Sequence, residues 1–477
     1  MRRDNSLGKI DWITVILYVL LACIGLAFIY ATTYSPINPS FFRFNTSYGK
    51  QFIFFGLSLF VAIVILILDS KFYTSFAYIL YGLIMLLLVG VLLFGVEIKG
   101  SKSWFKFGAI AFQPAELAKF ATVLGLAKYL SSYNINLEKL KDKFTAAAIL
   151  FLPIGLILLQ GDVGSMLVFS SLVFLLHREG LESSFLVIGF GLIFFSVMAL
   201  LFSSYVLIMS YAFVLILVFF YNRKDAYPIL KLIYWSLFFI IINVVFSKFI
   251  IPILPENFTF PYIILALLFT IILCVGFFLN RSGKPIIKLL IGVFFAVSFY
   301  TLSVNYLFNN ILKEHHRNRI NIILGKIHDP SNVGYNLEQS KIAISSGGFF
   351  GKGYLKGTQT MLNYVPEQST DFIFTSVAEE FGFVGSFFLI TIYVAFLLRL
   401  IFLAERQRSQ FSRVYGYGVV SIFFIHFAIN IAMTIGLAPV IGIPLPFLSY
   451  GGSSLLSFTI LLFVFIRLDT QNMLILR

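Results

Sequence analysis

The segment Pro366–Phe374 (Pro-Glu-Gln-Ser-Thr-Asp-Phe-Ile-Phe) joins a polar run to the abrupt start of an apolar stretch. Asp371 enters that stretch directly, so its carboxyl group should lie near a low-dielectric boundary, with its ionisation set by neighbouring groups. A carboxylate in such a place can act as a general base that removes a proton from a hydroxyl group. The structural alternative is helix capping, because Ser369, Thr370 or Asp371 before an apolar helix is a common N-cap. Both interpretations stay open at this point.

A second polar segment precedes this one and is rich in glycine. It contains Gln339–Gly348, with Lys341 inside it, and then Gly351-Lys352-Gly353 and Gly357-Thr358-Gln359. Glycines beside Lys and Ser let backbone N–H groups approach an anion such as a phosphate. Gly-Gly and Gly-x-Gly also mark ordinary turns, so the pattern alone does not decide between an anion site and a loop.

The composition defines the environment of these segments. Hydrophobic residues make up 59% of the 477 positions, charged residues 12%, and the mean hydropathy is +0.95. A soluble chain would have about 25% charged residues, so most of this surface must face lipid. The net charge of +14 sits in short loops, which indicates anchoring against anionic membrane lipids and argues against nucleic acid as a partner. Cys23 and Cys274 fall inside apolar stretches and indicate neither a disulfide framework nor a metal cluster.

The apolar stretches are long enough to cross a membrane. A span needs about 20 mostly apolar residues, and this criterion predicts an all-α bundle of about fourteen transmembrane helices. Lys and Arg in the short loops place both termini in the cytoplasm and the long polar stretch Asn309–Phe383 outside. The outer loop Glu97–Lys106 breaks the rule with Lys99, Lys102 and Lys106, which indicates a role for positive charge there. The predicted spans are Trp12–Ala31, Gln51–Leu68, Phe76–Val96, Ala115–Leu130, Phe144–Leu159, Val163–Leu176, Phe185–Phe202, Tyr205–Tyr221, Leu232–Ile251, Tyr262–Leu279, Ile287–Phe308, Val384–Leu403, Val414–Leu437 and Leu455–Ile466.

Polar side chains of the predicted spans gather near one face of the membrane. Glu116 and Lys119 lie in the first turns of one span, and Asp162 lies at a tight turn between two others. His426 and Asn430, one helical turn apart, are typical of residues that hydrogen-bond between helices. Ionisable residues within the spans, which would indicate an ion or proton pathway, are few. This favours a site at the outer interface over a transport route.

Four patches of the sequence carry a resemblance to a known family. They are Lys102-Ser103-Trp104 with Phe112–Lys119, the turn Gly161–Gly164, the stretch from Arg317 to Gly385, and Gly436–Ser454, which contains Gly-Ile-Pro-Leu-Pro-Phe. With these patches the chain resembles the SEDS family of shape, elongation, division and sporulation proteins, and its elongation-type members more than its division-type ones. Family members usually have ten transmembrane helices. The resemblance therefore implies one family-type transmembrane domain over residues 1–477, an insertion of four extra helices at 205–308 and a large extracytoplasmic loop at 309–383.

The resemblance also implies a function. It implies a peptidoglycan glycosyltransferase that polymerises lipid II at the outer face of the cytoplasmic membrane during elongation and shape maintenance, paired with a class B penicillin-binding protein. A hydroxyl of one sugar attacks the anomeric carbon of another and expels undecaprenyl pyrophosphate, which requires a base and positive charge for the leaving group. The match to the outer-loop aspartate of the family assigns Asp371 as the base. The substrate-binding candidates are Lys119, Arg319, Trp104, Lys102, Glu367, Glu116, Asp162, Lys341, Ser449, Gly451 and Gly452.

Several of these assignments have alternatives. Lys119 could snorkel to the interface, Trp104 could stack on a sugar or belong to the aromatic belt, and Glu367 could orient Asp371 or a cation, or be solvated. A divalent cation would assist the leaving group, although no ligand cluster specifies one. Two rival functions are a lipid II flippase, which predicts polar groups along a path to the midplane, and a non-catalytic scaffold for cell-wall enzymes.

Overall fold

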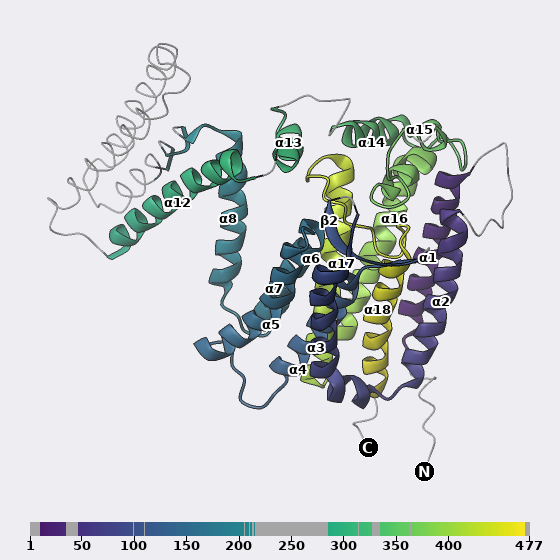
Figure 1. Ribbon diagram of the computed structural model, residues 1–477, viewed down its shortest axis with the longest axis horizontal. Coiled ribbons are helices and arrows are strands. Elements are labelled where there is room, and N and C mark those ends of the chain that lie inside the picture. The colour runs from purple at the N-terminus through teal and green to yellow at the C-terminus, as the bar shows by residue number, and fades with distance from the viewer. Residues whose placement is uncertain are drawn as a thin grey trace, which may run out of the picture. The chain divides into compact units, whose positions relative to one another are not determined.

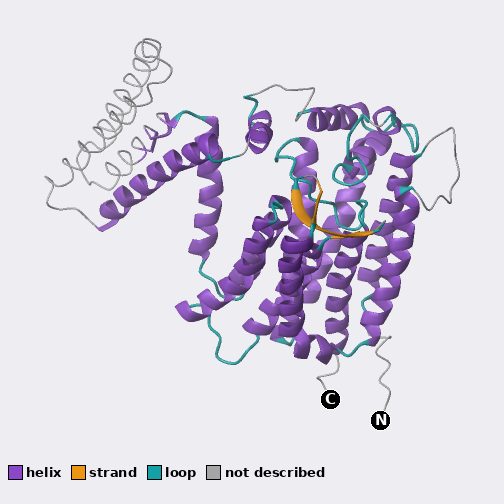
Figure 2. Ribbon diagram, viewed as in Figure 1, coloured by secondary structure: helices purple, strands orange, loops and turns teal. Residues whose placement is uncertain are grey.

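The chain is described by a computed structural model in which helices dominate (Figures 1 and 2), and this confirms the all-α class. Two compact units are present, one formed by Met1–Leu186 with His328–Arg477 and the other by Val187–Ile327. The predicted insertion at 205–308 falls in the second unit, and the spans predicted between 205 and 279 lie largely outside the described residues. The structure describes residues 10–34, 46–98, 100–108, 110–204, 206–208, 210–211, 214, 285–312, 314–326, 334–362 and 364–472.

Most helices have the length and composition of membrane spans. One predicted span corresponds to the shorter helix α4 (Pro114–Leu130), and another to a shorter apolar stretch formed by α6 (Val163–Ser170) and α7 (Leu172–Arg178). A third corresponds to α12 (Pro285–Asn310). The predicted polytopic bundle is thus confirmed. Within the described residues, eight helices are long and apolar enough to cross a membrane: α1 (Trp12–Thr33), α2 (Ser47–Ile67), α3 (Ser70–Phe94), α5 (Leu140–Leu159), α8 (Ser183–Leu201), α16 (Ile373–Glu405), α17 (Gln410–Ile435) and α18 (Gly452–Asn472).

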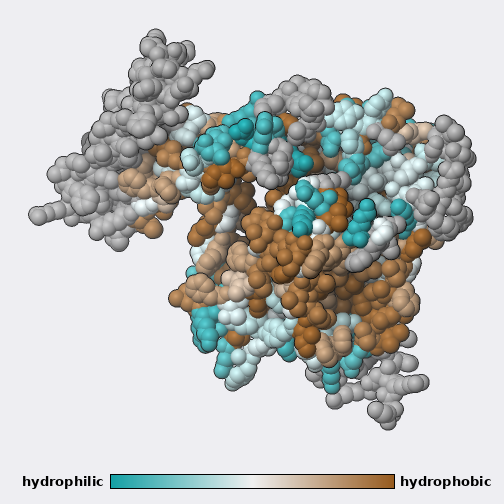
Figure 3. Space-filling view, in the orientation of Figure 1, coloured by the Kyte–Doolittle hydropathy of each residue, from teal (hydrophilic) through white to brown (hydrophobic). Residues whose placement is uncertain are grey.

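Apolar side chains of these helices point either into the bundle or toward the surroundings. Leu21, Phe396 and Leu462 have no exposed surface and belong to one continuous core, in which α18 packs on α2, α3 on α4, and α16 on α17. Others such as Phe60 and Leu93 are 63% and 66% exposed. Figure 3 shows apolar side chains over the middle of the helices of the first unit and polar ones nearer their ends. This is the arrangement expected where lipid is the solvent.

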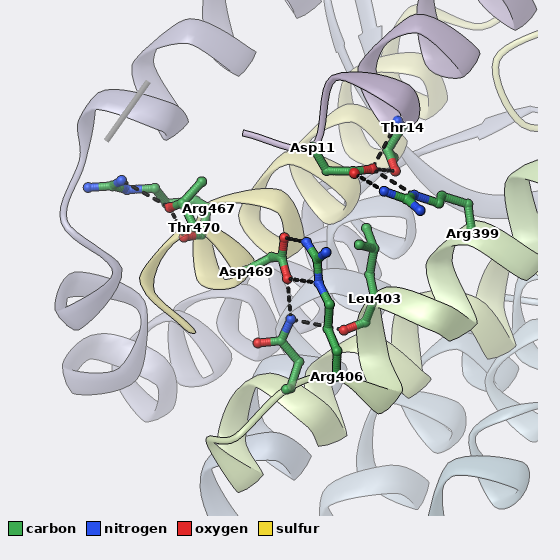
Figure 4. Close-up of polar contacts among 9 residues, drawn as sticks. Asp11, Thr14, Arg399, Leu403, Arg406, Arg467, Asp469 and Thr470 are labelled. Carbon is green, nitrogen blue, oxygen red and sulfur yellow. Dashed lines mark hydrogen bonds and ion pairs between the residues drawn. The ribbon is translucent and has the colours of Figure 1, made fainter. Parts of the chain in front are cut away.

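The first unit has two different ends. Helices α14 (Tyr335–Ser346) and α15 (Thr358–Met361) lie at one end, whereas α1 begins and α18 ends at the other (Figure 1). Ion pairs tie the helices together at this second end. Arg399 in α16 pairs with Asp11 before α1, and Arg406 after α16 pairs with Asp469 in α18 (Figure 4). The two described chain ends therefore lie on the same side, as the even number of predicted spans requires.

Helix α16 contains a sharp kink. Gly382 has φ 63° and ψ −155°, a conformation that an L side chain rarely adopts. A Cβ atom at this position would also lie 2.4 Å from the backbone nitrogen of Gly351, so the loop before α15 packs directly on the kink. The kink divides α16 into two portions. The shorter one begins at Ile373 and lies inside the stretch predicted as a polar loop, and the longer, apolar one begins where the sequence predicted a span.

A small antiparallel sheet follows α3 and was not predicted. Strands β1 (Val96–Ile98), β2 (Ser101–Phe107) and β3 (Ile110–Phe112) form a sheet in the order β1-β2-β3, with Val96 opposite Trp104. The loop expected at Glu97–Lys106 is thus largely strand. A three-stranded sheet of such short strands has too few residues for its alternating pattern to stand out from the apolar helices beside it.

The second unit contains α8, α12 and α13 (Glu314–Ile323) among its described elements. Helices α8 and α12 are joined by hydroxyl groups, since Ser196 Oγ lies 2.7 Å from Tyr300 Oη. Asn305 Nδ2 of α12 donates to Ser204 Oγ at 2.8 Å. These polar bonds between apolar helices are of the kind that holds helices together in lipid. The role of the 205–308 region as an insertion stays a prediction.

Candidate active site

Asp371 lies in a tight turn directly before α16. The carbonyl oxygen of Glu367 accepts hydrogen bonds from the backbone N–H groups of Thr370, Asp371 and Phe372, at 3.1, 3.0 and 3.3 Å. Glu367 itself has φ 55°, so the turn begins in the left-handed region. The N-cap residue of α16 is Phe372, without a side-chain cap bond. Because the helix begins two residues after Asp371, the predicted N-cap at Ser369, Thr370 or Asp371 is wrong.

The turn is attached to the segment that joins α17 to α18. Asn430 Nδ2, in α17, donates to the carbonyl oxygens of Asp371 at 2.9 Å and Ile443 at 2.8 Å. A Cβ atom built on Gly442 would lie 3.4 Å from Oδ2 of Asp371, and Gly442 has φ 79°. Two of the sequence patches, 366–374 and 436–454, therefore meet at the half-buried Asp371 carboxyl group.

Ser449, Gly451 and Gly452 hold this joining segment in place. The hydroxyl of Ser449 accepts from the backbone N–H of Leu445 at 2.8 Å, and the backbone N–H of Gly451 donates to Gln51 Oε1 at 3.1 Å. A Cβ atom on Gly452 would lie 2.4 Å from the ring of Phe54, so only glycine allows α2 this close. These residues support the site through contacts with the protein, and their predicted contact with substrate stays a prediction.

Lys119 and Glu116 form a buried ion pair. Lys119 Nζ lies 2.8 Å from both carboxylate oxygens of Glu116 and 3.0 Å from Nε2 of His426. Lys119 is 1% exposed and Glu116 5% exposed, so Lys119 does not snorkel to an interface. His426 also contacts the carbonyl oxygen of Pro444 through Nδ1 at 3.1 Å. The predicted role of Lys119 as a pyrophosphate contact loses support because its charge is already neutralised inside the bundle.

The glycine-rich loop does bind an anion, but the anion is a side chain of the protein. Glu379 in α16 is fully buried and accepts from the backbone N–H groups of Gln359 and Thr360 at 2.8 and 2.9 Å. Lys352 Nζ lies 2.8 Å from the same carboxylate. A Cβ atom on Gly357 would lie 2.8 Å from Glu379 Oε2. The predicted phosphate interpretation of this loop is therefore replaced by an internal clamp onto α16.

Lys341 reaches the end of α17 from the loop helix α14. Its neighbour Ser340 donates to the carbonyl oxygen of Thr434 at 2.7 Å, which fixes α14 against α17. A Cβ atom on Gly436, the residue that ends α17, would lie 2.7 Å from Lys341 Nζ. The side chain is exposed and, within the part of the chain that the structure describes, makes no hydrogen bond or ion pair. Gly436 precedes Gly442, the glycine next to Asp371, by six residues in the sequence.

The other predicted site residues have contacts of their own. Asp162 is the N-cap of α6 and accepts from Ser165 N at 3.0 Å. Lys102 Nζ donates to the carbonyl oxygen of Leu93 at 3.2 Å, and Trp104 is half-buried in β2. The side chain of Glu367 accepts from Thr370 Oγ1 at 3.1 Å. Arg319 belongs to α13 of the second unit.

Two residues of the site were not predicted to belong to it. Asn430 was predicted to hydrogen-bond between helices, but its partners are Asp371, in the turn before α16, and Ile443, in the segment that joins α17 to α18. The signal was present, since an amide inside an apolar span must find partners. Gly442 lies within the patch Gly436–Ser454, but its position next to Asp371 depends on the fold and could not be predicted from the sequence. Among the described residues, no group of three His, Cys, Asp or Glu side chains could hold a metal ion.

Membrane-length helices with an acidic group held at one end define a multi-pass helical membrane protein with a candidate site at one face. A sequence model of the FtsW/RodA/SpoVE family, described as cell cycle proteins, matches residues 11–230 and 208–474. The chain belongs to this family, which confirms the resemblance drawn from the four patches.

Relatives named RodA or MrdB and a relative named FtsW are all similar to the chain. The chain is 30% identical to peptidoglycan glycosyltransferase RodA of Treponema pallidum over 95% of this chain and 96% of the relative. It is 29% identical to peptidoglycan glycosyltransferase MrdB of Escherichia coli K12, covering 84% of this chain and 80% of the relative. A probable peptidoglycan glycosyltransferase FtsW of Thiomicrospira cyclica is 26% identical over 98% of this chain and 93% of the relative.

Solved structures share the fold. A chain of a peptidoglycan synthase complex, studied for the coordination of polymerisation and crosslinking, matches with a TM-score of 0.61 at 24% identity, covering 97% of this chain and 98% of that one. The crystal structure of the rod shape determining protein RodA of Thermus thermophilus matches with a TM-score of 0.52 at 21% identity over 97% of both chains. At these identities the likeness establishes the architecture.

Proposed function

We propose that this chain is a peptidoglycan glycosyltransferase that polymerises lipid II at the outer face of the cytoplasmic membrane. The full-length relatives named for this activity support the proposal. The elongation-type role rests on the Gly-Ile-Pro-Leu-Pro-Phe patch and on the relatives named RodA and MrdB, and a division-type role is the alternative.

The reaction forms one bond and breaks one. A sugar hydroxyl oxygen attacks the anomeric carbon of a second lipid-linked sugar while the bond from that carbon to the pyrophosphate oxygen breaks. The hydroxyl proton passes to a base, and the electron pair leaves with undecaprenyl pyrophosphate. General base catalysis of this kind contributes about 100- to 10,000-fold to a rate when the base is within hydrogen-bond reach of the hydroxyl.

The placement of Asp371 is the observation that carries the proposal. Its carboxyl group is half-buried, next to a glycine that leaves room beside Oδ2, at the end of the bundle that also holds α14 and α15. The backbone on both sides of its Cα is held, by Glu367 and by Asn430. A pre-positioned carboxylate at an interface is what a base for a lipid-linked sugar requires.

Lys341 is the first candidate for contact with the pyrophosphate. Lys341 belongs to α14, which is attached to the end of α17 through Ser340. Its exposed ammonium group therefore lies at Gly436, where the segment that carries Gly442 begins. Arg319 and Lys102 remain further candidates, and Trp104 a candidate for stacking on a sugar. No step is assigned to a divalent cation.

The proposed topology and partner follow from the same resemblance. Both termini would lie in the cytoplasm, because the end that holds Asp11 and Asp469 also carries the arginine-rich loop between α16 and α17. The loop helices α14 and α15 would then lie outside. A class B penicillin-binding protein would cross-link the strands that this chain makes.

The test is polymer synthesis by the purified protein with its penicillin-binding partner and lipid II in detergent. We expect glycan strands from wild type and none from Asp371→Asn. The control is Asp69→Asn, which changes a capping carboxylate outside the site. Polymer that persists in Asp371→Asn would remove the assignment of the base. Lipid II transport into vesicles without polymer, with any partner, would favour the flippase.

A further inference from the structure

Asn430 is a polar residue in the last two turns of the membrane-length helix α17, with no exposed surface. Both of its side-chain N–H groups face backbone carbonyl oxygens of other segments, Asp371 O at 2.9 Å and Ile443 O at 2.8 Å. An amide in this environment is costly unless it is paired, so these two bonds determine how the side chain is oriented. Its own oxygen has no hydrogen-bond partner within the described residues. The amide therefore acts as a double donor between two segments.

We propose that Asn430 is the positioning residue for the Asp371 carboxylate. The inference rests on the proposed function, because it assigns a role in setting the base of that reaction. Asn430 holds the Asp371 turn and the Ile443 segment at a fixed separation, and this places Gly442 against the carboxylate. Asn430 touches the backbone of Asp371 and acts on catalysis through it.

The bonds around Asp371 explain why one amide has this effect. The backbone N–H of Asp371 is held by Glu367 O at 3.0 Å, and its carbonyl is held by Asn430. With both sides of the Cα held, the direction in which the side chain leaves the backbone is set, and Oδ2 of Asp371 lies 3.4 Å from a Cβ atom built on Gly442. Tyr450 N donates to Ser369 O at 2.7 Å and supplies a second attachment of the same turn. Gln368 Nε2 also donates to Thr360 O at 3.0 Å, so the loss of Asn430 would release the Asp371 end of the turn while its Gln368 and Ser369 end stays attached.

The chain offers a matched control for the stability effect. Tyr415 is fully buried in the same helix, α17, and its hydroxyl donates to Leu461 O of α18 at 3.1 Å. This bond lies toward the start of α17 and leaves the Asp371 turn and α14 untouched. Tyr415→Phe therefore reports the cost of losing one buried side-chain to backbone bond of α17.

The experiment compares Asn430→Leu, Asn430→Gln and Tyr415→Phe in the full chain with its penicillin-binding partner. A misplacement of about 1 Å at a reacting group costs about 100-fold in rate, so we expect Asn430→Leu to lower kcat by about that factor. The KM for lipid II should change little, because the groups that contact the substrate remain. Asn430→Gln keeps both donors and should recover part of the rate. Tyr415→Phe should polymerise at close to the wild-type rate with a similar loss of Tm.

Backbone hydrogen exchange gives a readout that does not depend on activity. Exchange at residues 370–372 should speed up in Asn430→Leu and stay at the wild-type rate in Tyr415→Phe, whether or not any variant polymerises. The inference is overturned if Asn430→Leu leaves exchange at 370–372 unchanged, if it polymerises at the wild-type rate, or if Tyr415→Phe loses as much activity at equal Tm. A wild-type protein that makes no polymer with any partner would overturn the proposed function instead, and the exchange result would still test the attachment.

Discussion

Lys119 Nζ lies 2.8 Å from each carboxylate oxygen of Glu116, and the two side chains are buried one helical turn apart in α4. Removal of one partner from such a pair leaves an uncompensated charge and costs about 3–5 kcal/mol. We therefore expect Lys119→Met to lower the Tm strongly, measured by thermal unfolding in detergent. The double variant Lys119→Met with Glu116→Leu should recover most of that stability.

Polymer synthesis by the double variant separates a structural role of Lys119 from a direct one. If the pair serves to join α4 to His426 and the bundle, a stable double variant should make glycan strands at a reduced but measurable rate. A double variant with wild-type Tm and no polymer would contradict this and support Lys119 as a direct contact of the substrate.

Glu379 and Glu380 are adjacent and both buried, but they differ in their partners. Glu379 accepts two backbone N–H groups and pairs with Lys352, whereas neither carboxylate oxygen of Glu380 has a hydrogen-bond partner within the described residues. Glu379→Gln should destabilise the protein by about 1–3 kcal/mol, because it leaves buried donors unsatisfied. Limited proteolysis between residues 347 and 362 should speed up. Glu380→Gln should leave both measurements unchanged or raise the Tm, and equal effects of the two substitutions would refute the clamp.

Lys341 should act on substrate binding more than on the chemical step. We expect Lys341→Gln to raise the KM for lipid II with a small change in kcat. The substitution removes a positive charge that would attract the negatively charged pyrophosphate of the substrate. Lys356→Gln is the control, since Lys356 is also an exposed lysine of the loop after α14. A similar rise in KM for both variants would indicate a general effect of net charge. Loss of the ammonium group from the end of α17 should lower stability by about 0.3–1 kcal/mol.

The sequence predicted the elements better than the contacts between them. Long apolar stretches identify spans because lipid imposes one length, and the ends of α1, α5 and α17 agree to within a few residues. Asp371 stood out because a carboxyl group next to an apolar stretch is unusual. The partners of these groups come from positions far apart in the chain, such as the bond from Gln51 to Gly451, and no local pattern reports them.

Lys119 and the glycine-rich loop show the same limit of sequence. Lys119 lies near the start of a predicted span, where a snorkelling lysine is expected, but His426 of α17 and Phe458 of α18 enclose it. The glycine-rich loop has the composition of an anion site, and sequence cannot tell whether the anion is a ligand or Glu379. In both places the fold supplies an internal partner of opposite charge or a hydrogen-bond donor, which sequence alone does not reveal.

Asp11 links the start of α1 to α16, and this link should depend on pH. Its carboxylate accepts from Thr14 N at 3.1 Å and from Arg399 Nε at 3.2 Å. Burial alone would raise the pKa of Asp11, but the hydrogen bonds from Arg399 and Thr14 outweigh burial and hold the pKa below its usual value of 3.8. A carboxyl group with a lowered pKa in the folded state stabilises the fold above the pKa of the unfolded chain, and this contribution is lost as the pH falls through the folded-state pKa.

Asp11→Asn should therefore lower the Tm at neutral pH, and its difference from wild type should shrink below about pH 4. Asparagine is as good an N-cap as aspartate, so the substitution isolates the ion pair with Arg399 from the capping of α1. Asp69→Asn, at the cap of α3, is the matched control, because Asp69 is exposed and its side chain bonds mainly to Lys71 N and Gln471. Its Tm should change less, since exposed charges contribute little. A Tm difference for Asp11→Asn that stays constant from neutral to acid pH would show that the ion pair does not stabilise this end of the bundle.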